Sequence, residues 1–106
     1  MKTIQVLLMS ALFTVSAIST VQAAGDAAVG ESTYLSKGCV GCHGPAGDSQ
    51  APEMFPKLSG LEEAYIATQL TAFRSGERAG PTMNPMASTL TDEDINHLAA
   101  YLSAQK

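Results

Sequence analysis

The chain has 106 residues, a formal net charge of −4, two cysteines and no tryptophan. Its acidic balance argues against binding to nucleic acid, which needs a basic patch, and against electrostatic binding to anionic membranes. A chain of this length forms one small domain, which buries a modest fraction of its surface and often needs a cofactor or a covalent staple.

Residues 1–23 have the pattern of a secretory signal peptide. Lys2 is followed by an apolar stretch at residues 4–18, and a small-residue cleavage pattern ends at Ala23. The stretch is too short and too rich in Ser and Thr to span a bilayer, so we expect no stable membrane insertion. Cleavage would leave a single domain at residues 24–106, exported to the periplasm, with five basic and ten acidic side chains.

A first helix is predicted for residues 26–37, where Asp26 can cap its start. Gly30 lies inside this helix and costs about 1 kcal/mol relative to alanine. We therefore interpret Gly30 as a point at which another backbone approaches closely. Tyr34 lies one turn later on the same face.

A haem-attachment motif follows this helix. Cys39 and Cys42 lie three positions apart and His43 comes next. Each thiol can form a thioether with one vinyl group of the porphyrin, and the histidine can then bind the iron as its fifth ligand. A thioredoxin-like dithiol would need a βαβ pattern, a zinc site would need further Cys or His ligands, and a disulfide across so short a loop would stabilise little. We therefore predict one covalently bound haem c per chain.

The middle of the chain is predicted as a loop followed by a helix. Residues 44–58 have loop composition throughout. Residues 61–75 are predicted to be helical, and Ile66, Leu70 and Phe73 are spaced as a buried stripe.

A second loop is predicted at residues 77–90, and it holds two methionines that could be the sixth ligand of the iron. Pro81 and Pro85 lie two residues to either side of Met83 and restrict its backbone, which suits a weak thioether that must be held against a metal. Met86 is the alternative ligand, although its place nearer the final helix is more typical of core packing.

The final helix is predicted to open at Thr91, which with Asp94 forms a pattern akin to a capping box. Its buried stripe is predicted to consist of Ile95, Leu98, Ala99 and Leu102. His97 lies off this stripe, so we expect it in solvent and not at the iron. The sequence contains no strand pattern, repeat or second domain, and the predicted fold class is all-α.

Taken together, the leader, the segment CVGCH, the methionine loop and the C-terminal helix resemble a class I bacterial cytochrome c. The segments APEMFPKLSG, YIATQL, FRSGER and MNPMASTLTDEDINHLAAYLS are most similar to the cytochrome c4/c5 subgroup. The resemblance covers residues 24–106. Cytochrome c4 has two such domains in tandem whereas this chain has one, so a two-haem function is not carried over.

The resemblance implies a small cytochrome c fold, with three to five helices wrapped around one haem and the terminal helices crossing at right angles. In such proteins a glycine and an aromatic residue of the first helix pack against a leucine and an aromatic residue of the last. Gly30, Tyr34, Leu98 and Tyr101 occupy the matching positions here.

The resemblance also implies roles at the haem. A proline carbonyl in the loop after the haem motif accepts a hydrogen bond from the ligand histidine, and Pro52 matches that place. Such a bond would orient the imidazole and raise its basicity. Methionine ligation maps to Met83, with Met86 as the less favoured substitute.

The function predicted from these features is that of a periplasmic one-electron carrier in a respiratory chain, and not of an enzyme. A low-spin haem held by His43 and Met83 would have no open coordination position. Its partners would dock transiently: an electron donor, and a terminal oxidase or reductase as acceptor. Two alternatives stay open: a fixed haem c subunit of a larger periplasmic oxidoreductase, and a ligand-binding or peroxidatic haem protein.

Overall fold

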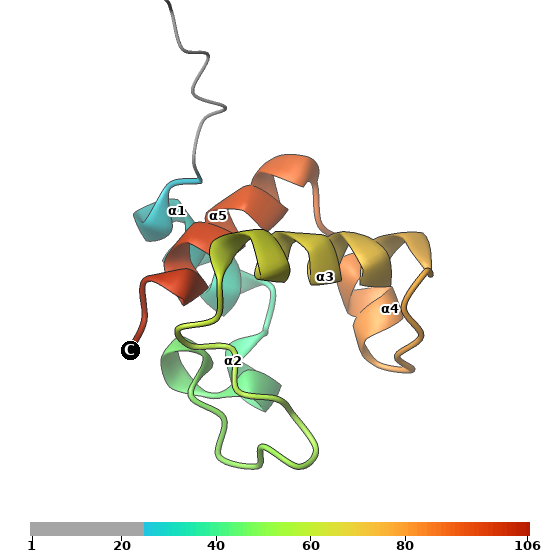
Figure 1. Cartoon of the computed structure of the whole chain (residues 1–106), viewed down its shortest axis with the longest axis horizontal. Helices are drawn as coiled ribbons and strands as arrows, with labels where there is room; N and C mark the ends of the chain where they lie inside the picture. The colour runs from blue at the N-terminus through green and yellow to red at the C-terminus, as the bar shows by residue number, and fades with distance from the viewer. Residues whose placement is uncertain (1–24) are drawn as a thin grey trace, which may run out of the picture.

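The computed structural model describes residues 25–106, and this part of the chain is built from helices without strands (Figure 1). The elements are α1 (Ala27–Ser36), α2 (Val40–His43), the short 3-10 turn η1 (Pro45–Gly47), α3 (Glu63–Ser75), α4 (Met83–Ala87) and α5 (Asp92–Ser103). The prediction of an all-α fold is confirmed. The expected signal peptide at residues 1–23 lies outside the described residues.

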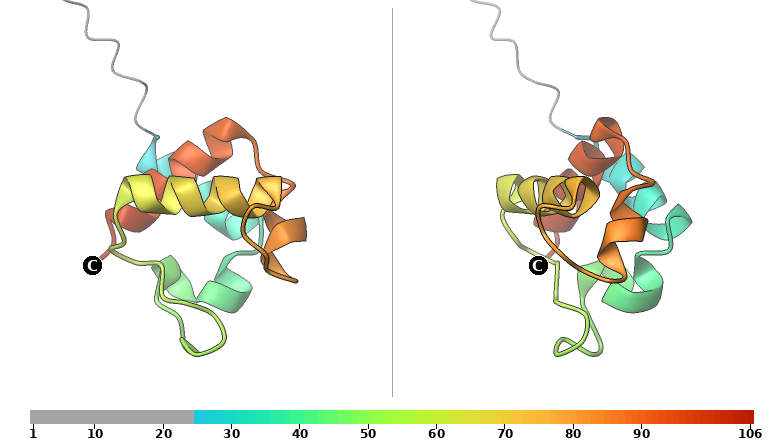
Figure 2. Two further views of the ribbon diagram at one scale, coloured as in Figure 1. Left: turned by 45° about the vertical axis from the view of Figure 1, so that its right-hand side comes forward. Right: turned by 90° about the vertical axis from the view of Figure 1, so that its right-hand side faces the viewer.

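The first and last helices, α1 and α5, pack against each other (Figure 2). A Cβ atom at Gly30 would overlap the carbonyl group of His97 and would lie 2.7 Å from Cβ of Tyr101. Only a glycine therefore permits this approach. Tyr34 and Leu98, 1% and 2% exposed, are the largest fully buried side chains and lie in the core beside this contact. The predicted packing of the two helices at Gly30 is confirmed.

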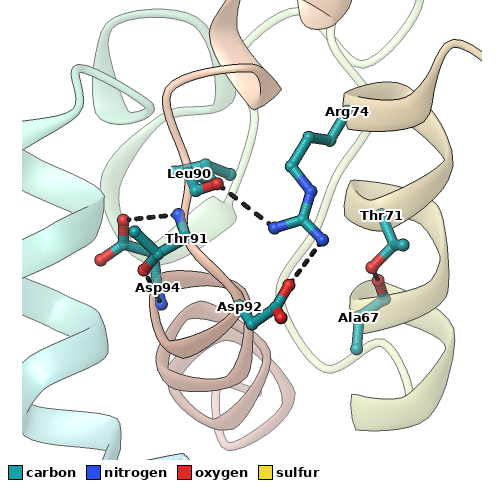
Figure 3. Close-up of polar contacts among 7 residues, drawn as sticks. All are labelled: Ala67, Thr71, Arg74, Leu90, Thr91, Asp92 and Asp94. Carbon is teal, nitrogen blue, oxygen red and sulfur yellow. Dashed lines mark hydrogen bonds and ion pairs between the residues drawn. The ribbon is translucent and has the colours of Figure 1, made fainter.

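Both helices of this pair begin with the caps that their sequences indicate. The Asp26 carboxylate accepts hydrogen bonds from the backbone N–H groups of Ala28 and Val29, at 2.8 and 3.3 Å. Thr91 and Asp94 form a capping box, with side-chain-to-backbone bonds of 3.1 and 3.0 Å (Figure 3). Each cap satisfies N–H groups that the helix leaves free and is typically worth about 1 kcal/mol.

His97 differs from its expected place in solvent. Its side chain is partly buried, and its Nδ1 atom accepts a hydrogen bond of 2.8 Å from the backbone N–H of Asp26. The start of α1 is thereby tied to the middle of α5. The sequence pattern placed His97 off the buried stripe of its own helix, but it could not show that α1 packs against that side.

The helix α3 packs on both α5 and α4, and one arginine fastens its end. The guanidinium of Arg74 donates to the carbonyl of Leu90 at 3.3 Å and pairs with the carboxylate of Asp92 at 2.6 Å (Figure 3). Since the Asp92 side chain is 80% exposed, the ion pair itself adds little stability. Its effect is to fix where the chain turns from α4 into α5.

One predicted loop contains a helix. Residues 77–90 were expected to form a loop, yet Met83–Ala87 form α4. Pro85 is the third residue of this helix, within the first turn, where backbone N–H groups have no partner inside the helix and a missing N–H costs nothing. This proline is thus compatible with a helical start.

Replacement of Gly30 by alanine is expected to lower the free energy of unfolding by about 1–3 kcal/mol, because the added methyl group forces α1 and α5 apart. Guanidinium unfolding of the haem-loaded protein measures this change. Gly41→Ala is the matched control, since a Cβ atom at Gly41 meets nothing within 4 Å. Equal stabilities of the two variants would contradict the role given to Gly30.

Candidate functional site

A cavity of about 310 Å³ collects the residues that were expected to hold the haem. Its lining includes Cys39, Cys42, His43, Met83 and Met86. A second cavity, of about 130 Å³, is lined by several of the same residues, His43 and Met83 among them. The remaining walls are mostly apolar and come from α1, the loop after η1, α3, the segment between α3 and α4, and α5. His43 and Met83 therefore line the same two cavities.

The two cysteines lie on one helical turn that begins directly after α1. The backbone N–H of His43 donates to the carbonyl of Cys39 at 2.9 Å, which closes this turn. Residues three apart in a helical turn lie on the same side, so both thiols face the same region. Cys39 is half-buried, Cys42 is exposed, and neither forms a disulfide. Burial raises the pKa of the Cys39 thiol, which keeps it protonated at neutral pH.

The ring of His43 is held by a backbone carbonyl. Its Nδ1 atom lies 2.8 Å from the carbonyl oxygen of Pro56. Since a carbonyl can only accept, Nδ1 carries the proton, and Nε2 is left as the nitrogen with a free lone pair. The side chain is 7% exposed, and the ring of Phe55 meets it edge-on at 6.3 Å between centroids. This imidazole is fixed in the orientation and tautomer that a metal ligand requires.

The carbonyl that accepts this hydrogen bond belongs to Pro56. The expected residue was Pro52, so that prediction is wrong. Pro52 lies inside a single helical turn, which is closed by the N–H groups of Met54 and Phe55 donating to the carbonyl of Ala51 at 3.0 and 2.8 Å. The turn redirects the chain before it reaches the histidine. A sequence of loop composition does not reveal such a turn, so the expected proline was four residues too early.

The two methionines of α4 both line the larger cavity. Met83 and Met86 are three residues apart, on the same face of the helix. Met86 was expected to pack in the core, but it is half-buried and lines the cavity. Met83 alone of the two lines both cavities, together with His43. Of the two methionines, Met83 is therefore the one that shares both cavities with His43.

Two polar side chains, one in the lining and one outside it, carried no signal in the sequence. The guanidinium of Arg78 lies 4.5 Å from the centroid of the Phe73 ring and donates to Oε1 of Gln69 at 2.7 Å. It is the one charged side chain in the lining of either cavity. Asn84 binds three backbone groups around the turn that precedes α4. Both contacts depend on how the segment after α3 folds, and no residue spacing indicates them.

Tyr34 connects this site to the packed pair of helices α1 and α5. It lines the larger cavity, and its hydroxyl donates to the carbonyl of Gly44, directly after His43, at 2.5 Å. Its ring lies 5.6 Å from that of Tyr101. The residue after the histidine is therefore anchored to the helix pair.

A flat apolar cofactor with iron at its centre fits this donor set. An imidazole with a free Nε2 and a thioether line one apolar cavity, and two thiols lie on its lining. Among residues 25–106 no group of three or more His, Cys, Asp or Glu side chains could hold another metal ion. In the same part of the chain no helix is long and apolar enough to cross a membrane.

Comparison with known proteins agrees with this chemistry. A family model described as Cytochrome c matches residues 27–106. Cytochrome c-554(548) of Halomonas halodenitrificans is 44% identical over 78% of this chain and 100% of its own length. Cytochrome c4 of Pseudomonas aeruginosa is 39% identical over 94% of this chain and 48% of its own length. A protein named thiosulfate dehydrogenase electron acceptor, of Stutzerimonas stutzeri, is 39% identical over 74% of this chain and 40% of its own.

A solved structure of a cytochrome c4 is also similar to this chain. Reduced recombinant cytochrome c4 from Pseudomonas stutzeri superposes with a TM-score of 0.67 and 38% identity, over 76% of this chain and 48% of that one. The chain thus spans about half the length of the cytochrome c4 relatives that it matches. Proteins of this family carry covalently bound haem c, and Cys39, Cys42 and His43 fit a single haem. The predicted cofactor is confirmed.

The stability of the protein is expected to fall at alkaline pH because of Tyr34. Burial raises the pKa of Tyr34 to about 12 from its usual 10.0. The folded state therefore favours the neutral phenol. Its contribution to the free energy of unfolding is fully present below pH 10 and is lost as the pH rises from 10 towards 12. The loss amounts to about 2–3 kcal/mol at 1.36 kcal/mol per pKa unit.

The measurement compares unfolding free energies of the wild type and of Tyr34→Phe between pH 8 and 12. Above pH 10 the wild type should lose more stability than the variant, whose side chain cannot ionise. Curves that stay parallel across this interval would contradict the burial of a neutral phenol at this position.

Proposed function

This chain belongs to the cytochrome c family, as a class I cytochrome of the c4 type, and from that premise we propose that it carries single electrons in the periplasm. His43 and Met83 are the proposed axial ligands, and Cys39 and Cys42 the points of covalent attachment. The observation that carries the proposal is that an imidazole with a free Nε2 and a thioether line the same apolar cavity. With both bound, the iron would have no coordination position free for a substrate.

The surrounding residues favour a high reduction potential. When bound, haem c supplies reversible one-electron chemistry at iron. The Pro56 carbonyl holds the His43 ring in one orientation. The Met83 thioether favours ferrous iron, and the apolar walls disfavour the additional charge of the ferric form. A high potential suits donation to a terminal oxidase or a similar acceptor.

Arg78 is proposed to bind the carboxylates that haem carries. Its guanidinium is already oriented by the Phe73 ring and by the Gln69 amide, so little side-chain entropy is lost when an anion binds. A single cation in an otherwise uncharged lining complements an anionic group there.

The proposed exchange surface lies beside the exposed Cys42. Met54 lines the larger cavity, and its side chain is 74% exposed. A small apolar patch around a cofactor edge suits brief docking of redox partners, because such contacts need to bury little area. We propose no catalytic reaction for the chain itself.

A second candidate function is that of an electron-transfer subunit. It is favoured by the similarity to the thiosulfate dehydrogenase electron acceptor, of which this chain covers 40%. Purification from the periplasm at native expression separates the two candidates. A carrier elutes alone by size exclusion, whereas a subunit elutes with a catalytic partner in fixed stoichiometry.

Met83→Ala is expected to abolish the weak long-wavelength absorption of a sulfur ligand on ferric iron, and to lower the reduction potential because a ligand that favours ferrous iron is lost. Met86→Ala is the matched control. It should keep the absorption and cost about 1–2 kcal/mol of stability, less than a fully buried methionine would. Survival of the band in Met83→Ala, with its loss in Met86→Ala, would reverse the assignment.

Carbon monoxide provides the test of the carrier function. The ferrous wild-type protein should bind it poorly at neutral pH because a firm thioether occupies the sixth position. Optical titration measures the binding, and Met83→Ala should bind readily and serve as the positive control. Ready binding by the wild type would instead favour a ligand-binding or peroxidatic haem protein.

A further inference from the structure

The side chain of Asn84 makes three hydrogen bonds, all to backbone groups. Its Nδ2 atom donates to the carbonyl of Phe73 at 2.8 Å and to the carbonyl of Arg78 at 2.9 Å. Its Oδ1 atom accepts from the N–H of Gly80 at 2.8 Å. An amide side chain has two donor hydrogens and an acceptor oxygen, and all three are used here.

These bonds join the end of α3 and the segment after it to the start of α4. Phe73 lies in the last turns of α3, and the residues from Gly76 to Thr82 form no regular helix. The helix α4 is five residues long and has no side-chain cap at Thr82. A helix of that length is not stable alone in water. Asn84 therefore supplies much of the order of the segment that leads into α4.

Asn84 is also the direct neighbour of Met83 in the chain. Its backbone N–H donates to the carbonyl of Gly80 at 2.9 Å, so main chain and side chain both bind the same glycine. The backbone at Met83 cannot shift towards or away from the cavity without breaking one or more of these four bonds. Two of them end on the carbonyls of Phe73 and Arg78, which would lose this partner.

We propose that Asn84 is a positioning residue for the sixth iron ligand: by fastening the segment from Phe73 to Gly80 onto α4, it holds the Met83 thioether at the cavity and so sets how readily an external ligand displaces it. This inference rests on the proposed function, in which Met83 binds the iron. Asn84 itself does not line either cavity and acts through the backbone.

Asn84→Asp is the sharpest variant, because it keeps the size of the side chain and the acceptor for Gly80. It replaces the two donors with a carboxylate oxygen that faces the carbonyls of Phe73 and Arg78, and these contacts become repulsive. Asn96→Asp is the matched control for the added charge, since Asn96 is exposed on α5. Asn84→Ser removes the bonds without repulsion and provides the same test should the aspartate variant fail to take up haem.

The experiment is an optical titration of each ferric, haem-loaded protein with imidazole, together with the pH at which the sulfur–iron absorption disappears. In Asn84→Asp, imidazole should bind at least tenfold more tightly than in the wild type, and the absorption should disappear at a pH at least one unit lower. Asn84→Ser should shift in the same direction by a smaller factor. Asn96→Asp should stay within twofold of the wild type.

A purely structural role for Asn84 would give a different result: a lower melting temperature with unchanged imidazole affinity and an unchanged pH of band loss. That result would overturn the positioning role while leaving Met83 as the ligand. A wild-type protein that lacks the sulfur–iron absorption would overturn the proposed function as well, so the two failures are distinguishable.

Discussion

The close approach of α1 and α5 at Gly30 is the contact on which the rest of the structure depends. A side chain at this position would overlap the carbonyl of His97, so the two ends of the domain can meet only through a glycine. The hydrogen bond from Asp26 to His97 closes the same contact. Once the ends are joined, residues 38–90 form one closed excursion between them (Figure 2). Most of the residues that line the larger cavity belong to this excursion.

Within that excursion the two proposed iron ligands are positioned in the same manner. Each lies on a helix of five residues or fewer, which has too little packing of its own to fix a side chain. The ring of His43 is held by the carbonyl of Pro56, and the backbone beside Met83 is held by Asn84. Short hydrogen bonds thus replace regular structure where the chain must meet a cofactor. A large apolar cofactor would then complete a core that a domain of this size can barely form alone.

The sequence predicted the features that depend on neighbours in the chain. The caps at Asp26 and Thr91 and the haem motif need only local residues, and the packing of Gly30 followed from a family resemblance. The expected role of Pro52 failed because a helical turn in the loop brings Pro56 to the histidine instead. Asn84 was missed for the same reason, since its partners are up to eleven residues away and are placed by tertiary folding. Apart from the contact at Gly30, which the resemblance supplied, prediction succeeded where the chemistry is local and failed where backbone groups of distant turns must meet.

The proposed function requires that this protein holds iron between His43 and Met83. Proton NMR of the ferrous protein tests it most directly, with methyl-labelled methionine and residue-specific assignment. A methionine that binds iron lies above the porphyrin ring, whose ring current shifts its methyl signal far upfield. One methionine methyl should show this shift, and it should belong to Met83. Assignment of the shifted signal to Met86 or Met54, or the absence of any shifted methionine signal, would contradict the account.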